Sequence, residues 1–334
     1  MKALFIGGTG NISYLCSALA LEKGWELYLL NRGGVKPEGL IKEAISLVAD
    51  INNQKQVSKV LEGLKFDVVV DFIAFTEEDV VRDYQLFKNI TNQYIYISSA
   101  SCYQKPVGYP IITESSPLKN PHWQYSRDKI AGEDILHKLY REKDFPMTIV
   151  RPSLTYHTVI PVPIGAWKNY NVIDRIKKGK PIIVHGDGLS PWVITHAADF
   201  AKGLIGLMGN QQSIGHAFHI TTDEVLTWDK IYQTLGMVVG VKPNLIHIAS
   251  EKICELSQKV GGKDMEGTLL GDKACGVIFD NSKIKTFVPE FKATISFADG
   301  IRNTLKWFEE SPGRLEVDLE VEKWIDDMID LYCK

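Results

Sequence analysis

The chain has 334 residues, of which 45% are hydrophobic and 24% charged, with a formal net charge of -3 at pH 7. That composition is typical of a globular protein with one large core or two modest ones, and the lack of a Lys/Arg-rich block argues against a nucleic-acid partner. The five cysteines form no Cys-x-x-Cys pair and no apolar run approaches the roughly 20 residues that span a bilayer, so we expect a cytoplasmic protein without disulfides, a zinc site or a membrane segment.

In the first half of the chain, short β-rich runs alternate with segments of helical periodicity. Runs such as "DVVVDF" are apolar almost throughout, which is typical of parallel strands covered by helices on both faces. The order predicts an α/β fold with a doubly wound parallel sheet. The expected strands are Ala3–Ile6, Glu26–Leu30, Leu47–Asp50, Asp67–Phe72, Tyr94–Ser98 and Met147–Arg151, and the expected helices are Ile12–Lys23, Gln54–Leu64, Glu78–Asn89 and Gln124–Glu142.

The regular alternation ends after Arg151, where several prolines fall in a loop. A helical pattern at 170–180 and the strand "PIIVH" follow, and we interpret them as an insertion. A helix in "HAADFAKGLIGLMG" and the strand His216–Thr221 are expected to return to the sheet. The remainder is mainly helical by pattern, and its last helix places four apolar residues on one face, Trp324, Ile325, Met328 and Ile329.

The first expected strand runs directly into the turn "GGTG" and then into a helix. This arrangement brings backbone N–H groups and a helix N-terminus to one point, which favours a phosphate. Gly7 permits the tight turn and Gly10 removes a Cβ where a pyrophosphate would approach. Ser13 occupies the third glycine position, so the helix must pack with a hydroxymethyl group there. A plain turn is the alternative, but the βαβ context favours a Rossmann-type dinucleotide site.

We therefore divide the chain into a dinucleotide-binding core at 1–155, to which 192–221 returns, and a smaller, mainly C-terminal region at 156–191 and 222–334. The smaller region is expected to bind the substrate.

The second strand ends in Asn31-Arg32, where many dinucleotide sites carry an acidic residue for the ribose hydroxyls. A guanidinium without a neighbouring acid favours a 2′-phosphate, so we expect NADP, with NAD as the alternative. The alternative interpretation is that Arg32 is a solvated loop residue that contacts no cofactor. Asp50 and Ile51, at the end of the third strand, are expected to flank the adenine.

Tyr125 and Lys129 are four residues apart and therefore share one face of a helix. A lysine ammonium, together with a cationic nicotinamide, stabilises a phenolate, so we expect the pKa of Tyr125 to fall towards the range of a general acid or base. Upstream, "YIYISSASCY" ends a strand in Ser98-Ser99 at the carboxyl edge of the sheet. Taken singly, these serines could instead form a strand-end turn.

These residues resemble the short-chain dehydrogenase/reductases, in particular the extended type called NAD-dependent epimerase/dehydratase. The similarity spans most of the chain: "GGTGNIS", "DFIAF", "ISSASCY", Tyr125-x-x-x-Lys129, "RPSLTY", "WVITHAADFA", "DNSKI" and "GIRNTLKWF". The resemblance implies that Ser99 bonds the substrate oxygen, Tyr125 moves the proton and Lys129 also holds the nicotinamide ribose. The expected cofactor contacts are Gly7, Thr9, Gly10, Asn11, Ile12, Asn31, Arg32, Asp50, Ile51, Ala74, Tyr125, Lys129 and Ser153.

The implied function is an NAD(P)-dependent oxidoreductase or epimerase acting at a carbinol or carbonyl carbon of a small molecule, a sugar or sugar nucleotide. The same three side chains serve an epimerase, a dehydratase and a reductase, so the reaction type stays open. Pro191 and Trp192 stand where sugar-nucleotide enzymes of this family carry a diphosphate-binding arginine. The alternative is a non-catalytic dinucleotide-sensing or RNA-binding protein on the same fold. The resemblance also implies a homodimer, and the scattered histidines indicate no metal.

Overall fold

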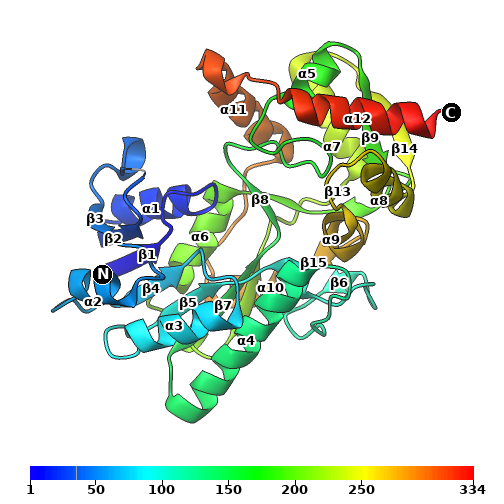
Figure 1. The fold of residues 1–334 in the computed structure, drawn as a ribbon. Helices are drawn as coiled ribbons and strands as arrows, with labels where there is room; N and C mark the ends of the chain where they lie inside the picture. Colours follow the sequence, from blue (N-terminus) through cyan, green and yellow to red (C-terminus); the bar gives the residue numbers. More distant parts are fainter. Residues whose placement is uncertain (35) are drawn as a thin grey trace.

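The computed structural model describes residues 1–34 and 36–334. Its main feature is a seven-stranded parallel sheet in the order β12-β7-β5-β4-β1-β2-β3 (Figure 1). From β1 the chain builds outward through β2 to β3 and then returns to β4 on the other side of β1, which confirms the doubly wound sheet. The strands are β1 (Lys2–Ile6), β2 (Glu26–Asn31), β3 (Ile45–Val48), β4 (Val68–Asp71), β5 (Tyr94–Ile97), β7 (Met147–Pro152) and β12 (Ala217–Ile220).

Both faces of this sheet are buried, because alternate side chains of each strand enter different cores. Ala3 and Phe5 pack with α1, α6 and α10, whereas Leu4 and Ile6 pack with α2, α3 and α4. This two-sided burial explains why the strands are apolar almost throughout. The covering helices are α1 (Ser13–Glu22), α2 (Gln54–Val60), α3 (Glu77–Phe87), α4 (Gln124–Lys143), α6 (Ala197–Leu207) and α10 (Ser282–Phe287).

The largest differences from the expected boundaries are in β3 and α2. The third strand covers Ile45–Val48 rather than Leu47–Asp50, because β3 is an edge strand whose mostly exposed side chains leave no clear burial pattern. The expected helix Gln54–Leu64 ends at Val60. Gly63 adopts a left-handed φ of 74°, which turns the chain out of the helix.

The rest of the chain forms a second region around four two-stranded sheets. The C-terminal part is mainly helical, as expected, but it also contains β14, which pairs in parallel with β9, a strand far away in sequence. The strands are β6 (Ile111–Ile112), β8 (Leu154–Tyr156), β9 (Pro181–His185), β10 (Pro191–Trp192), β11 (Ile194–His196), β13 (Leu226–Thr227), β14 (Asn244–Ile248) and β15 (Ile278–Phe279); the helices are α5 (Asn171–Lys177), α7 (Trp228–Val239), α8 (Ser250–Lys259), α9 (Glu266–Thr268), α11 (Phe297–Glu309) and α12 (Leu319–Tyr332).

The last helix packs as expected, with its apolar face buried against α8. Trp324 donates its indole N–H to the Ser257 hydroxyl at 3.0 Å. Figure 1 shows the second region on the side of the molecule away from β1, β2 and β3. Its elements α5, α8, α12, β9 and β14 gather there. Among the described helices, none is both long and apolar enough to cross a membrane.

Candidate active site

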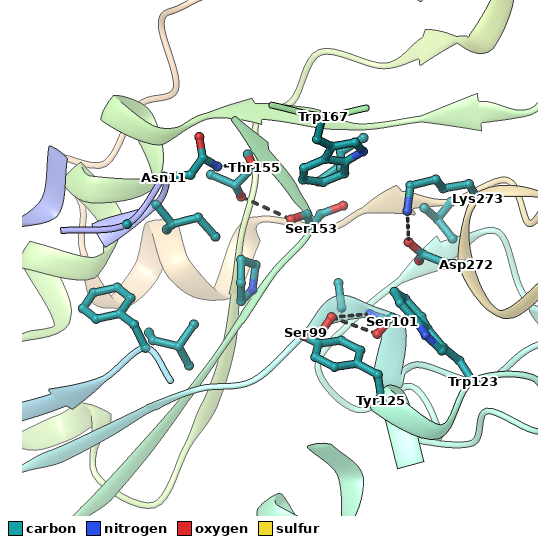
Figure 2. Close-up of a pocket in the computed structure, with 18 of the residues that line it drawn as sticks. Asn11, Ser99, Ser101, Trp123, Tyr125, Ser153, Thr155, Trp167, Asp272 and Lys273 are labelled. Atoms are coloured by element: carbon teal, nitrogen blue, oxygen red, sulfur yellow. Dashed lines mark hydrogen bonds and ion pairs between the residues drawn. The ribbon is translucent and has the colours of Figure 1, made fainter. Parts of the chain in front are cut away.

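A cavity of about 410 Å³ opens at the carboxyl ends of β1, β4 and β5, where the strand order reverses (Figure 2). The glycine turn after β1 lines one part of it, and Phe72 and Ile73 after β4 line another. The second region closes the cavity with residues such as Trp167 and Lys273. Open α/β sheets bind their ligands at this topological position.

The glycine turn holds its shape through two local features. Gly7 adopts φ of +80°, and a Cβ on it would lie 2.6 Å from the Ile73 Cγ2 atom, so a larger residue does not fit. The buried Ser13 hydroxyl donates to the Gly7 carbonyl at 2.6 Å and accepts from the Gly10 N–H at 2.8 Å. The hydroxymethyl group at the third glycine position therefore braces the turn rather than disturbing it.

The turn fits an anionic group such as a pyrophosphate. Among the described residues, the Asn11 and Ile12 N–H groups, which precede α1, have no hydrogen-bond acceptor. The Asn11 side chain is used elsewhere: its amide donates to the Thr155 carbonyl at 3.0 Å and its oxygen accepts from the His157 N–H at 2.9 Å. Asn11 thus ties the turn to β8 and leaves only its backbone for an anion.

Ser99 and Tyr125 lie next to one another on the same side of the cavity (Figure 2). Ser99 follows β5, and its hydroxyl lies 2.8 Å from the Ser101 hydroxyl, which accepts from Ser126 at 2.7 Å. Tyr125 lies in the first turn of α4, and its ring packs against Trp123 with centroids 4.9 Å apart. The strand end and the helix start therefore bring both hydroxyl-bearing side chains to one wall.

Lys129 lies one helical turn behind Tyr125 and is 1% exposed. Its ammonium donates to the carbonyls of Ala74 at 2.6 Å and Ile97 at 2.7 Å, and lies 5.9 Å from the centre of the Tyr125 ring. Burial lowers the pKa of Lys129 to about 8, and Asp71 acts in the opposite direction. The lysine is thus held at the carboxyl ends of β4 and β5, close to the phenol.

The expected fall in the pKa of Tyr125 is not found. Burial raises the pKa of Tyr125 to about 12, and hydrogen bonding by Ser99 only partly opposes the rise. The free energy lost by removing a phenolate from water exceeds the stabilisation that one hydrogen bond from Ser99 supplies. The phenol is therefore protonated at neutral pH.

The structure brings part of the expected site to the cavity and places the rest outside its lining. The expected residues that line the cavity are Gly7, Gly10, Asn11, Ile12, Ser99, Tyr125 and Ser153. The expected residues outside the lining are Thr9, Asn31, Arg32, Asp50, Ile51, Ala74 and Lys129. Of these, Lys129 donates to the Ala74 carbonyl and lies 5.9 Å from the ring centre of Tyr125, which lines the cavity.

The residues expected at an adenosine lie around the ends of β2 and β3. Arg32 is exposed and has no carboxylate partner among residues 1–34 and 36–334. The buried Asn31 amide nitrogen also lacks an acceptor there. Asp50 caps a turn by accepting from the Asn52 N–H at 3.0 Å, and Ile51 is buried in the core.

No sequence signal indicated several of the residues that complete the cavity. These are Lys105 and Trp123 from the core, and Trp167, Asp272 and Lys273 from the second region, and they lie beside Trp192. Asp272 and Lys273 lie in a π-helical turn, η4 (Leu269–Lys273). No local motif links these residues, because they come from segments that only the tertiary fold brings together. The described residues contain no cluster of three or more His, Cys, Asp or Glu that could hold a metal.

The fold and the site together define a dinucleotide-binding α/β protein with a second region over its crevice. The model of the NAD dependent epimerase/dehydratase family matches residues 3–221. The chain belongs to this family, which confirms the resemblance drawn from its motifs.

Curated relatives are distant. The chain is 25% identical over 260 residues to the chloroplast stem-loop binding protein of 41 kDa b of Arabidopsis thaliana, covering 74% of this chain and 65% of that protein's length. It is 20% identical over 258 residues to 2′-dehydrokanamycin reductase of Streptomyces kanamyceticus, covering 76% and 71%.

Solved structures share the fold at low identity. An epimerase of Methanothermobacter thermautotrophicus has a TM-score of 0.74 at 15% identity, with 92% of each chain covered. UDP-glucuronic acid 4-epimerase of Bacillus cereus, in complex with UDP-glucuronic acid and NAD, has a TM-score of 0.70 at 21% identity, covering 93% of this chain and 99% of that one.

Proposed function

We propose that this protein is an NAD(P)-dependent oxidoreductase or epimerase that transfers a hydride at a carbinol or carbonyl carbon, with Tyr125 as the acid/base. The observation that carries the proposal is the pairing of Ser99 and Tyr125 on one wall of the cavity beyond the glycine turn. Family membership supports an NAD-type cofactor.

Each side chain has a separate task in this proposal. The Ser99 hydroxyl donates a hydrogen bond to the substrate oxygen and polarises it. The Tyr125 hydroxyl gives its proton to that oxygen during reduction, or accepts it during oxidation. The Lys129 ammonium, fixed by two carbonyls, supplies positive charge behind the phenol.

The residues present fit a dinucleotide. The Asn11 and Ile12 N–H groups would hold its pyrophosphate, and Ser153 on the opposite wall would lie near its nicotinamide. When bound, the nicotinamide accepts or supplies the hydride. We also propose the division into a core at 1–155 with 192–221 and a substrate region at 156–191 and 222–334, and a homodimer.

The test follows reduction of the cofactor by its near-ultraviolet absorbance. The full-length protein is incubated with oxidised NAD or NADP and a panel of sugars, sugar acids and aliphatic alcohols. For an oxidoreductase we expect absorbance to rise with at least one panel member, and for an epimerase we expect a change of configuration in a panel sugar, followed by NMR, without a net rise. Dinucleotide binding with neither change across the panel would indicate a sensor and refute the enzyme.

We expect NADP(H) to bind more tightly than NAD(H), with Arg32 as the cause. A charge-assisted contact of this partly exposed kind is worth roughly 1.5–3 kcal/mol, or about 10- to 150-fold in affinity. Arg32→Ala should remove most of that preference and leave NAD(H) affinity unchanged, because NAD(H) has no 2′-phosphate. Fluorescence titration of both cofactors measures this, with Lys36→Ala as a control from the same loop.

If the wild type favours NADH, or if Arg32→Ala weakens both cofactors equally, the cofactor is NAD and Arg32 is a solvated loop residue.

We expect UDP-sugars to bind weakly. Trp192 is 2% exposed and packs on Trp228 with ring centroids 5.4 Å apart, so an aromatic core residue stands where a diphosphate-binding arginine is expected. Without a guanidinium fork, two phosphate charges lose their strongest partner. Calorimetry with UDP-glucose should show a dissociation constant well above micromolar. Micromolar binding would make a sugar nucleotide the substrate.

RNA binding is the second candidate function, because one curated relative is named for binding a stem-loop. The formal net charge of -3 opposes it, since nucleic-acid affinity depends on clustered cations. A gel-shift titration with a stem-loop RNA at low and physiological salt separates the two functions. We expect no salt-sensitive complex.

A further inference from the structure

The cavity holds a buried positive charge that the catalytic proposal does not use. Lys105 lines the cavity and is 2% exposed. Among residues 1–34 and 36–334, its ammonium has neither a hydrogen-bond acceptor nor a carboxylate partner. An ammonium withdrawn from water costs several kcal/mol unless an anion compensates it. A lysine kept in this position therefore points to an anion that arrives from outside the chain.

The second lysine of the cavity is already neutralised. Lys273 donates to the Asp272 carboxylate at 3.0 Å, and its ammonium lies 5.8 Å and 6.0 Å from the ring centres of Trp123 and Trp167. Figure 2 shows the two indoles on either side of this ion pair. Lys105, Lys273 and Asp272 are the charged residues of the lining, so one positive charge is in excess.

Lys105 lines the same cavity as the Asp272–Lys273 pair and the indole rings of Trp123 and Trp167. Lys105 and Asp272 also act in opposite directions on the pKa of the buried Cys275 thiol, which Lys105 lowers and Asp272 raises. The cavity therefore combines one unpaired positive charge, flat apolar walls and the Trp192 indole N–H, which has no acceptor among the described residues.

We propose that the substrate is a compact sugar acid whose single carboxylate is held by Lys105 and whose ring packs against the indole rings that line the cavity. The proposal rests on the proposed function and names the substrate class of the same site. One excess charge matches one carboxylate, whereas a diphosphate would bring two negative charges. The volume agrees: 410 Å³ is near the lower end of ligand pockets, about 300–1,000 Å³, and part of it must receive the nicotinamide. The C–H faces of a sugar ring suit flat indole walls.

The experiment measures binding rather than turnover. The full-length protein with oxidised cofactor is titrated by calorimetry with D-glucuronate, D-glucose, glucose 6-phosphate and UDP-glucose. We expect glucuronate to bind roughly 10-fold or more tightly than glucose, because a charge-assisted contact is added. Lys105→Met should abolish that difference, and Lys105→Arg should keep most of it. The control is Lys119→Met, an exposed lysine whose backbone pairs with that of Lys105, which should behave as the wild type.

Thermal unfolding without ligand gives an independent readout. Lys105→Met removes an uncompensated buried charge, so its melting temperature should equal or exceed that of the wild type. A clear decrease would show that a partner within the chain already compensates Lys105, and would overturn the proposal.

The binding outcomes are equally decisive. The proposal fails if no carboxylate binds better than its neutral counterpart, including the case in which neither binds, or if Lys105→Met retains the difference. Tightest binding by glucose 6-phosphate or UDP-glucose would assign the site to phosphate instead. Because hydride transfer does not enter the binding measurement, a protein that distinguishes glucuronate from glucose but neither reduces its cofactor nor epimerises a sugar would refute the enzyme and leave this site intact.

Discussion

Tyr125→Phe is expected to reduce turnover by roughly 100-fold or more, the usual contribution of a general acid or base. The substitution removes one hydroxyl and keeps the ring that packs against Trp123 and Phe75. Dinucleotide affinity should therefore stay within a factor of about two, because the transition state loses its proton donor and the ground state loses little. Steady-state rates and fluorescence titration measure the two quantities separately.

Tyr140→Phe is the matched control, because Tyr140 is a half-exposed tyrosine on the same helix, away from the cavity. It should retain wild-type turnover. Equal rates for Tyr125→Phe and the wild type would show that another group moves the proton. A similar loss in both variants would show that the effect comes from α4 and not from the phenol.

The second large effect is on stability: Arg151→Met is expected to lower the free energy of unfolding by about 3–5 kcal/mol. Arg151 on β7 is 3% exposed and makes a two-point contact with the fully buried Glu133 of α4, with Nε and Oε1 2.9 Å apart. The Ser98 hydroxyl donates to the same carboxylate. Removing the guanidinium leaves a carboxylate enclosed without a counter-charge, which is the main source of the cost.

Urea unfolding measures the change, with Arg302→Met as the control. Arg302 pairs with Asp299 at 2.9 Å, but both side chains are more than half exposed. Water and salt screen that pair, so its loss should cost at most about 1 kcal/mol. A loss as small for Arg151→Met would mean that the buried pair does not hold α4 to the sheet.

This buried pair also has a functional consequence. Glu133 lies two turns beyond Tyr125 on α4, and Ser98 directly precedes Ser99. The Arg151–Glu133–Ser98 contacts therefore fix the helix that carries the phenol relative to the strand end that carries Ser99. The placement of Tyr125 relative to Ser99 therefore depends on an ion pair whose two residues, Glu133 and Arg151, come from separate elements.

Much of the core could be predicted from the sequence because its signals are local. An apolar run followed by Gly7 and a helical pattern describes one βαβ unit, and both faces of the sheet are buried as the continuous apolar strands indicate. The four-residue spacing of Tyr125 and Lys129 likewise follows from helix geometry alone. The prediction failed at β3, where an exposed edge strand carries no burial pattern, and at β14, whose partner β9 lies in a distant segment.

By itself, the sequence determined the sheet class, the glycine turn and the shared helix face of Tyr125 and Lys129, since backbone periodicity and steric limits act within a few residues. The tertiary structure alone decided the ionisation of Tyr125 and which distant residues complete the cavity. Burial, which depends on everything packed around the ring, raises the pKa of Tyr125 against the expectation from Lys129. The unpaired Lys105 reaches the same cavity as the Asp272–Lys273 pair because packing of the second region, and not any local pattern, brings these distant segments together.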